Sequence, residues 1–473
     1  MDANKLKEFV QNNKKLVILG GGALLLLLIG VIILTDRSNS PVQTVSKPKT
    51  PVGGDTTQTT SPSSGNIELV YWGLWEDNET LEELIEQYES ENPGVKIKYS
   101  RQRYGSTIEE AGYEKTLYTR LVQSYTSSDE PAPDIFRIHN TWLPKYRYLL
   151  SELPSSIMTS SEYAKEFYPT AVEDFTDTDG KIYAIPLEID GLVVFYNKKL
   201  LKEIGYTDEF PTDWNDLFDL ATKLTKKDNS GQIIQAGLSM GGTKDTMRFF
   251  EEILYFFMLQ EGMDIIDETR TKVTLNTQKG KRVLDRYISF STGEDAVWRN
   301  DIGLDTEMFF SGKLAMLIAP SWMTFDIIEA NSALEFDTAP LPQLRANNKE
   351  VYYSTYWGEA VSKNCKHPEE AWKFIKFLSE PANEKALYTS QSKIRTFGEP
   401  YSRVELNSLM VGEKYVDAIA KSANLMKSWQ IGPDDEVKEI FSDMIETVID
   451  GNDASSALSN AEKRINDVLA EYN

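Results

Sequence analysis

Six of the nine tryptophans stand where they could offer flat aromatic surfaces to a ligand. They follow predicted strands or lie in predicted loops, and they are Trp72, Trp75, Trp142, Trp322, Trp357 and Trp429. An indole ring can stack on the apolar C–H face of a sugar, while its N–H binds a polar group. Packing in the interior is the alternative for any one of them, but six such positions together favour a binding surface. Trp214 and Trp372 lie in helical patterns and are expected in the core, and Trp298 fits either role.

Polar side chains near these tryptophans could bind hydroxyl groups in pairs. Glu76, Asn140 and Asp190 follow predicted strands or lie in a predicted linking segment, and carboxylate or amide groups suit hydroxyls. For Glu76 and Asp190, a solvated loop carboxylate or a helix cap is an equal alternative. Gly242 is a weaker candidate, because a pair of glycines is more often a simple turn.

The residues that metal sites and nucleophilic catalysis need are scarce in this chain. It has one cysteine, Cys365, and two histidines, His139 and His367. A zinc site of Cys and His is therefore nearly excluded, and no internal disulfide can form. Residues 177–180 and 228–231 resemble pieces of a calcium loop, but both lack the Glu that an EF-hand needs and are expected to be hairpin turns. We therefore assign no catalytic residue, no metal site and no cofactor.

The chain is long and acidic. Its 473 residues exceed one ordinary core and suit two globular lobes with accessory segments. The net charge is −23, and the first 35 residues carry four cations and two anions, so the remainder carries −25. So acidic a body argues against nucleic acid and anionic lipid as partners, and it is compatible with a neutral ligand.

The N-terminal region has the pattern of a membrane anchor followed by a tether. Residues 16–35 are 20 residues without a charge, enough to span ~30 Å of hydrocarbon as a helix. Basic residues precede this run, so we expect residues 1–15 in the cytoplasm and the body outside, on a single-pass cell-membrane protein. A cleaved signal peptide is the alternative, although no A-x-A site follows. Residues 36–65 predict a disordered linker, since 19 of these 30 are Ser, Thr, Pro or Gly.

The body from residue 66 onward alternates between strand and helix patterns. Apolar residues spaced i, i+3, i+4 and i+7 predict a helix from Thr80, between strands at 67–72 and 95–99. Strand, helix and strand in this order are the seed of a parallel sheet, so the fold class is α/β. The same patterns predict strands at 133–138, 183–197 and 314–319, helices after 211–214 and over 248–259 and 368–378, and two amphipathic helices that close the chain.

Six segments of the body resemble, in order, the family 1 extracellular solute-binding proteins of the maltose-binding type. They are LVYWGLWEDNETLEELIEQYESENPGVKIKY, PDIFRIHNTWLPKY, DGKIYAIPLEIDGLVVFYNKKLLKEIG with PTDWNDLFDLATKLT, FFSGKLAMLIAPSW, APLPQ and GEAVSKNCKHPEEAWKFIKFLSEP. No single segment is diagnostic, whereas their common order is. The cysteine that usually carries the family's lipid anchor is missing, and the transmembrane segment would replace that anchor.

The resemblance implies a two-lobed α/β fold of the periplasmic-binding-protein type with a hinge. Within the solute-binding domain, residues 66–473, the N-lobe would comprise about 66–187 and 355–400, and the C-lobe about 188–354 and 401–473. The chain would cross between the lobes in two segments, near 185–194 and near 340–356, and a small-molecule ligand would bind in the cleft between the lobes. In many such proteins the hinge closes on the ligand, so we expect the same here.

The resemblance also implies a function, the capture of a carbohydrate for the permease subunits of an ABC importer. The segment GKLAMLIAPSW is similar to the family's strand that ends in a ligand-stacking aromatic, which makes Trp322 the strongest candidate. Trp429 precedes the penultimate helix, where the family often places another. Two other functions stay open: an extracellular glycosidase, which would need two carboxylates flanking a sugar, and a sensor subunit that presents its ligand to a receptor. A cationic ligand such as a polyamine is the chief alternative to a sugar.

Overall fold

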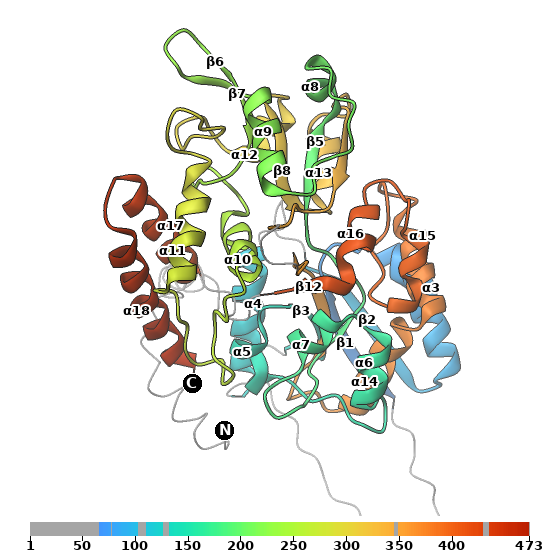
Figure 1. Ribbon diagram of the computed structural model, residues 1–473. Coiled ribbons are helices and arrows are strands. Elements are labelled where there is room, and N and C mark those ends of the chain that lie inside the picture. Colours follow the sequence, from blue (N-terminus) through green and yellow to red (C-terminus); the bar gives the residue numbers. More distant parts are fainter. Residues whose placement is uncertain are drawn as a thin grey trace, which may run out of the picture. The chain divides into compact units, whose positions relative to one another are not determined.

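The computed structural model describes residues 66–76, 78–102, 110–125, 132–344, 349–428 and 435–472 (Figure 1). The predicted cytoplasmic segment 1–15, the membrane anchor 16–35, the linker 36–65 and Trp429 lie outside these residues. Within the described part of the chain, no helix combines the length and the apolar character that crossing a membrane requires.

The first sheet is assembled from distant parts of the chain. Its strands are β1 (Ile67–Gly73), β2 (Val95–Arg101), β3 (Ile135–His139), β4 (Ile185–Pro186) and β11 (Trp357–Val361). Their spatial order is β2-β1-β3-β11-β4, with β1 parallel to β2 and β3 and with β11 antiparallel to β3 and β4. The helices between and after these strands are α3 (Asn78–Glu91), α4 (Glu110–Gln123), α5 (Leu143–Tyr146), η1 (Arg147–Leu149), α6 (Ser160–Glu166), α7 (Pro169–Phe175), α14 (Pro368–Leu378) and α15 (Pro381–Gln391).

The second sheet is built from one continuous stretch. Its strands are β5 (Leu192–Asn197), β6 (Lys226–Lys227), β7 (Ile233–Leu238), β8 (Leu314–Pro320) and β9 (Phe336–Ala339). Their order is β6-β7-β8-β5-β9, with β7 and β8 parallel and with β5 antiparallel to β8 and β9. The helices of this stretch are α8 (Lys198–Glu203), α9 (Trp214–Leu224), α10 (Phe250–Gln260), α11 (Gln278–Ser289), α12 (Asp305–Phe310) and α13 (Met323–Ala330).

The C-terminal part joins both regions. It contains η3 (Val404–Leu409), α16 (Asp417–Ser422), η4 (Ala423–Leu425), β12 (Met426–Lys427), α17 (Asp435–Ile449) and α18 (Ala454–Tyr472), and β12 pairs in parallel with β10 (Tyr352–Tyr353). α17 and α18 pack on each other and on α11. The stretch between η3 and η4 touches α6 and α7 on one side and β9 on the other. Because this stretch contacts both regions, the contacts do not assign it to one lobe, and the lobe boundaries proposed from the sequence remain predictions.

Most predicted elements are present with shifted ends. The strand-helix-strand unit appears as β1, α3 and β2, and the two closing helices appear as α17 and α18. The β-rich stretch 183–197 is divided into β4 and β5, which belong to different sheets. The division lies within residues 185–194, where the resemblance implies a crossing between the lobes. The apolar pattern alone does not show the division, because the whole stretch 182–195 is buried and mostly apolar.

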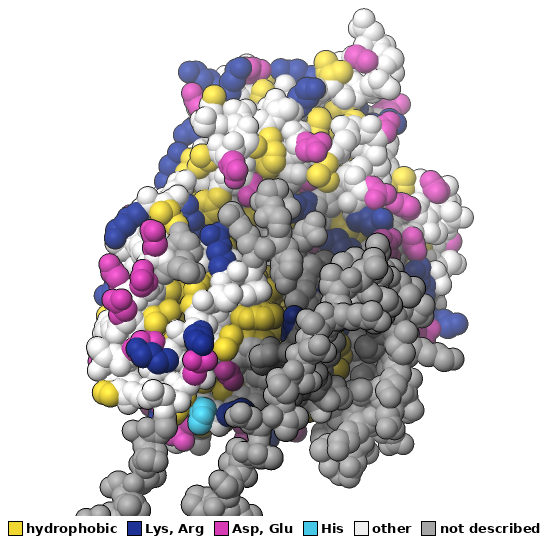
Figure 2. All heavy atoms as spheres, turned by 180° about the vertical axis from the view of Figure 1, so that it is seen from behind, with side chains coloured by type: hydrophobic (Ala, Val, Ile, Leu, Met, Phe, Trp, Pro, Cys, Tyr) yellow, Lys and Arg dark blue, Asp and Glu magenta, His cyan; other side chains and the backbone are white. Residues whose placement is uncertain are grey.

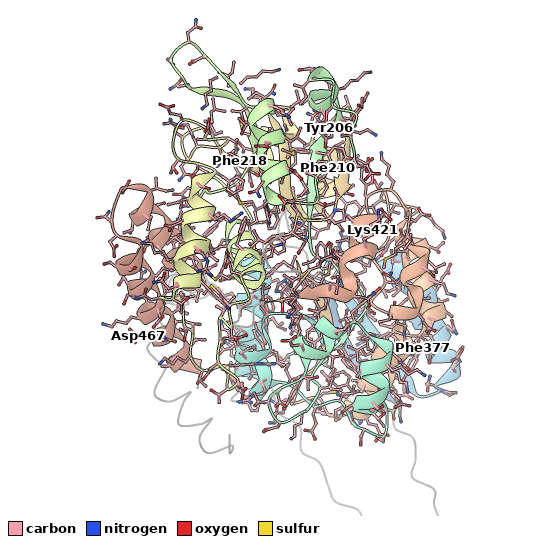
Figure 3. The ribbon with its side chains drawn as sticks, viewed as in Figure 1. Tyr206, Phe210, Phe218, Phe377, Lys421 and Asp467 are labelled. Atoms are coloured by element: carbon pink, nitrogen blue, oxygen red, sulfur yellow. The ribbon has the colours of Figure 1, made fainter. Side chains whose placement is uncertain are left out.

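Aromatic side chains fill the interior of the second sheet's region. Trp214 and Trp298 are fully buried there, which confirms the core assignment of Trp214 and settles that of Trp298. The Trp214 ring lies 4.6 Å from Phe257, and its Nε1–H donates to the Gln260 Oε1 at 2.7 Å. Phe218, Phe210 and Tyr206, labelled in Figure 3, pack at the margin of this core. Trp372, on α14, is likewise buried as the sequence predicts.

Replacing Trp214 by Ala should lower the free energy of unfolding by about 3–5 kcal/mol, because it leaves a cavity and removes the hydrogen bond to the Gln260 Oε1. Urea unfolding followed by circular dichroism measures this change. Trp214→Phe should lose less, since it keeps most of the volume. A loss below about 1 kcal/mol for Trp214→Ala would contradict the role of this residue in the core.

Candidate functional site

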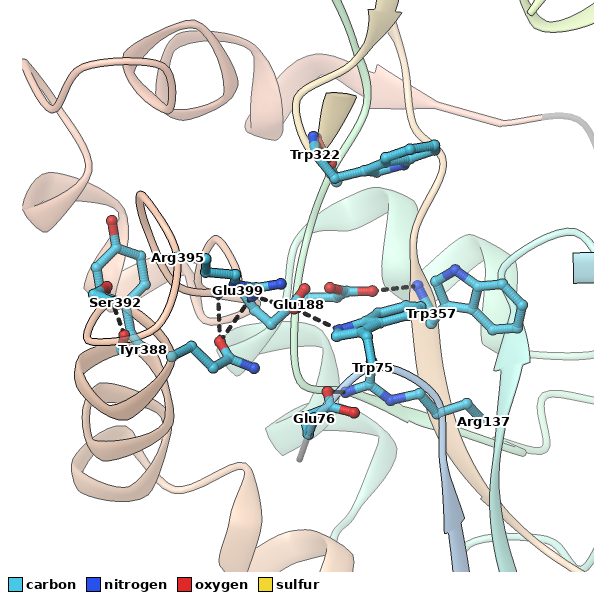
Figure 4. A network of polar contacts seen from close by, with 12 residues as sticks. Trp75, Glu76, Arg137, Glu188, Trp322, Trp357, Tyr388, Ser392, Arg395 and Glu399 are labelled. Carbon is cyan, nitrogen blue, oxygen red and sulfur yellow. Dashed lines mark hydrogen bonds and ion pairs between the residues drawn. The ribbon is translucent and has the colours of Figure 1, made fainter. Parts of the chain in front are cut away.

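Three half-buried tryptophans from the regions of two different sheets lie opposite one another. Trp75 stands in the loop after β1, and Trp357 is the first residue of β11. Trp322 lies between β8 and α13 and therefore belongs to the second sheet. Figure 4 shows Trp322 opposite Trp75 and Trp357, whose ring centroids meet edge to face at 5.8 Å. Aromatic rings that face each other from two sheets suit a ligand with flat apolar faces.

A buried cluster of charged side chains contacts Trp75. Its Nε1–H donates to the Glu399 Oε1 at 2.5 Å, and the Arg137 guanidinium lies 4.5 Å from its ring centroid. Arg137 pairs with Glu76 at 2.5 Å and, across the β3–β11 ladder, with Glu359 at 2.7 Å. The side chains of Arg137 and Glu76 are each only 3% exposed. The predicted ligand-binding residue Glu76 is thus engaged with Arg137 in this structure.

Trp322 is positioned through its backbone by Asp190. The Asp190 carboxylate accepts the backbone N–H of Ser321 at 3.2 Å, of Trp322 at 3.3 Å and of Gly191 at 2.7 Å. Asp190 lies between β4 and β5, where the chain passes from the first sheet to the second. Of the two roles left open for Asp190, the structure favours the cap, because the carboxylate satisfies N–H groups at the start of α13.

Asn140 and Trp142 are built into the interior beside the tryptophan site. The Asn140 Nδ2 donates to the Asp174 Oδ2 at 2.9 Å, and the side chain is fully buried. Trp142 is 1% exposed and is stacked between Tyr113 and Tyr146, with centroids 6.3 and 5.4 Å away. In this structure both faces of Trp142 are covered, so the loop position that suggested a ligand platform reflects packing instead.

Gly242 and the two calcium-like segments have structural explanations. The Gly242 N–H donates to the Met247 Sδ at 3.1 Å, and a Cβ at this glycine would lie 2.5 Å from a neighbouring hydroxyl oxygen. Residues 177–180 and 228–231 form the predicted hairpin turns, each closed around its first aspartate. Among the described residues, no group of His, Cys, Asp and Glu could hold a metal ion. Trp429 lies outside the described residues, so its role stays a prediction.

Sequence reasoning missed several polar residues of the site. Glu188, two residues before Asp190, is buried and accepts the Trp357 backbone N–H at 3.2 Å. Arg395 forms an ion pair with Glu399, and its guanidinium lies 4.7 Å from the ring of Phe325 on α13. The position of Glu188 two residues before Asp190 could have suggested it, but nothing in the sequence pattern separates Arg395 and Glu399 from ordinary loop charges.

Burial shifts the protonation of several acidic groups away from their ordinary range. Desolvation raises the pKa of Glu384 to about 8 and the pKa values of Asp190 and Asp305 to about 7. Desolvation also lowers the pKa of His139 to about 3. On the surface, by contrast, acidic and basic side chains are interspersed, as Figure 2 shows for the described residues on one face. The acidic and basic groups with these shifted pKa values therefore lie in the interior of the protein.

Comparison with known proteins places these features in one family. The family model described as bacterial extracellular solute-binding protein matches residues 72–385. A diacetylchitobiose-binding protein of Streptomyces coelicolor is 23% identical over 407 residues, which cover 82% of this chain and 86% of that protein. Diacetylchitobiose is the ligand named for that relative. The family model, by contrast, matches most of this chain.

Solved structures share the fold at low sequence identity. An ABC substrate-binding protein of Listeria monocytogenes in complex with cycloalternan has a TM-score of 0.64 and 21% identity, covering 86% of this chain and 99% of that one. A cyclo/maltodextrin-binding protein with maltotetraose has a TM-score of 0.65 and 17% identity, covering 87% and 99%. These likenesses show that the chain has the two-lobed α/β fold of periplasmic binding proteins, as the sequence predicted.

The buried carboxyl groups should make the protein more stable as the pH falls from about 8.5 to 6.5. In this range the folded state takes up protons on Glu384, Asp190 and Asp305, whereas the unfolded carboxyls, with pKa values near ~4, stay ionised. Each proton taken up adds up to about 1.4 kcal/mol per pH unit to the free energy of unfolding. His139 opposes this trend only below its unfolded pKa of ~6.5. Urea unfolding across the range measures the slope.

Glu384→Gln isolates one of these groups. The Glu384 Oε1 accepts the Ser402 hydroxyl, and a glutamine oxygen can replace it as an acceptor. The substitution should therefore reduce the pH slope and stabilise the protein most at pH 8.5. Glu82→Gln, on the exposed face of α3, is the control and should leave the slope unchanged. A wild-type slope of zero or of the opposite sign would show that these carboxyls are ionised when folded.

Proposed function

This chain belongs to the bacterial extracellular solute-binding proteins, and we propose that it captures a neutral sugar or oligosaccharide and delivers it to an ABC importer. The observation that carries the proposal is the position of Trp322, from the region of the second sheet, opposite Trp75 and Trp357 from the first (Figure 4). A sugar ring has apolar C–H faces that suit such platforms and hydroxyls that need polar partners.

Glu188 is the polar partner that the structure supports best. Its carboxylate accepts the Trp357 N–H and is drawn beside Trp75 and Trp357 in Figure 4. A carboxylate has about four lone-pair positions and can accept from two adjacent hydroxyls. Asn140 and Glu76, which were predicted for this role, already have partners within the protein. We therefore place Glu188 ahead of them as a hydroxyl-binding residue.

Ligand capture would proceed by rotation of the two lobes about the crossing segments. The backbone N–H of Thr355 donates to the Asp190 carbonyl at 3.0 Å, and Gly191 pairs with Ser354. The two crossing segments are thus joined side by side, which leaves few backbone torsions to absorb a rotation. A ligand that touches both sheets would stabilise the closed population. Release to permease subunits would follow reopening.

We infer binding without turnover, on the external side of a membrane. The family and its named relatives are binding proteins, and the sequence offers no catalytic motif. The uncharged run at 16–35 would anchor the chain, and residues 36–65 would span roughly 30 Å as a flexible coil. Such a tether would let the body move above the membrane and reach a permease.

Trp322→Ala should weaken binding of a neutral oligosaccharide roughly ten- to a hundred-fold, since stacking on one aromatic contributes on the order of 1–3 kcal/mol. Calorimetric titration with maltotetraose, mannobiose, diacetylchitobiose and spermidine measures affinity, and chromatography checks that each sugar returns intact. Because Trp322 is half buried, the ligand-free melting temperature should change little.

Trp372→Phe is the matched control and should leave the affinity unchanged, because Trp372 is fully buried on α14. Unchanged sugar affinity in Trp322→Ala would contradict the stacking role. Binding of spermidine alone would replace the sugar with a cationic ligand. A cleaved sugar, with cleavage lost on Glu188→Gln, would make the protein a hydrolase.

Membrane anchoring should leave the full-length chain in the membrane fraction after a carbonate wash. The reason is the 20-residue uncharged run at 16–35, which lacks a following cleavage site. Immunoblotting of the fractions checks this, and a variant without residues 1–35 should be soluble. A soluble mature form that begins near Thr35 would show that the segment is a cleaved signal peptide.

A further inference from the structure

Trp322 is covered on one face by an arginine that the sugar-binding proposal does not use. The Arg248 guanidinium carbon lies 5.0 Å from the Trp322 ring centroid and 5.4 Å from that of Phe249. Phe249 itself meets Trp322 edge to face at 5.8 Å. The indole is therefore supported by an aromatic edge and a flat cation, both from the segment just before α10.

Arg248 is fixed at both ends. Its backbone N–H donates to the Oδ1 of Asp305, a carboxylate that is fully buried at the start of α12. Its guanidinium donates to the Asp326 Oδ2 at 3.4 Å and to the Met323 Sδ at 3.7 Å, both on α13. Because α13 also begins directly after Trp322, arginine and indole are held on the same support.

The other tryptophan platform has the same construction. Arg137 lies 4.5 Å from the Trp75 ring centroid, and the Trp75 N–H is held by Glu399. Each platform thus has a guanidinium against one face, although Arg137 is buried and Arg248 is 44% exposed. A planar guanidinium can lie flat on an indole, whereas an ammonium is a point charge that cannot fix the plane of the ring.

We propose that Arg248 is a positioning residue for ligand binding: it holds the Trp322 ring in one orientation and leaves only the opposite face for the ligand. The proposal rests on the sugar-binding function proposed above and deepens it. The ion pair with Asp326 offsets the charge of Arg248, so the role proposed for Arg248 is to fix the plane of the ring.

The first test needs no ligand. In protein labelled with 5-fluorotryptophan, the ¹⁹F resonance of Trp322 is assigned by its absence in Trp322→Phe. Arg248→Gln and Arg248→Lys should both shift or broaden this resonance more than those of the buried tryptophans. Arg282→Gln, which removes another surface arginine paired with a carboxylate, is the control and should leave it in place. An unchanged Trp322 resonance in both Arg248 variants would overturn the proposal.

The second test is a double-mutant cycle with the neutral oligosaccharide that binds tightest among maltotetraose, mannobiose and diacetylchitobiose. Arg248→Gln should weaken binding roughly three- to ten-fold, the range expected for a cation–π contact, and Arg248→Lys should not restore it. In the Trp322→Ala background the same change should cost less than two-fold. An equal loss in both backgrounds, or full rescue by lysine, would show that Arg248 acts otherwise.

The two proposals fail differently. If wild-type protein binds none of the sugars, the proposed function is wrong, whereas the fluorine resonance still reports whether Arg248 orients Trp322. If sugars bind and Trp322→Ala weakens them, but Arg248→Gln alters neither affinity nor resonance, only the positioning role is wrong.

Discussion

The buried guanidinium of Arg137 is the interaction on which the first side of the site depends. Removing such a charge from water costs several kcal/mol, and two carboxylates must offset that cost at close range. One of them, Glu359, stands opposite Arg137 in the β3–β11 ladder, so the pairing of two strands fixes the pair. Trp75 then rests on the neutralised guanidinium. The pairing of β3 with β11 positions Arg137, and Arg137 in turn orients the ring of Trp75 in its loop.

The second side of the site is set by Asp190, which binds the backbone of Ser321 and Trp322 from a crossing segment. This carboxylate belongs to the link between the sheets and at the same time supports a ligand platform. A rotation of the lobes about that link would therefore begin at the residue that fixes Trp322. The proposed hinge and the proposed binding surface would thus share a single side chain, so a change at Asp190 should affect both.

The sequence predicted the elements with clear periodicity, such as α3, α9, α14 and α17, and placed Trp322 at the end of its strand. It could not separate a loop tryptophan that packs inward from one that stays half exposed. Trp142 and Trp357 were both expected after strands or in loops, and tertiary contacts with Tyr113 and Tyr146 help to bury the former. Glu188, Arg395 and Glu399 were missed for the same reason, because their partners lie up to several hundred residues away in the chain.

The strand β11 has a further consequence for how the protein is made. It lies between β3 and β4, yet it is synthesised long after both, following the whole of the second sheet. Until residues 357–361 leave the ribosome, β3 keeps an open edge and Arg137 lacks one of its two carboxylates. The strands of the second sheet are all made earlier, since they run from 192 to 339 without interruption. The nascent chain thus carries a complete second sheet while the first sheet is incomplete, and that order exposes an unpaired strand edge to chaperones and to neighbouring chains.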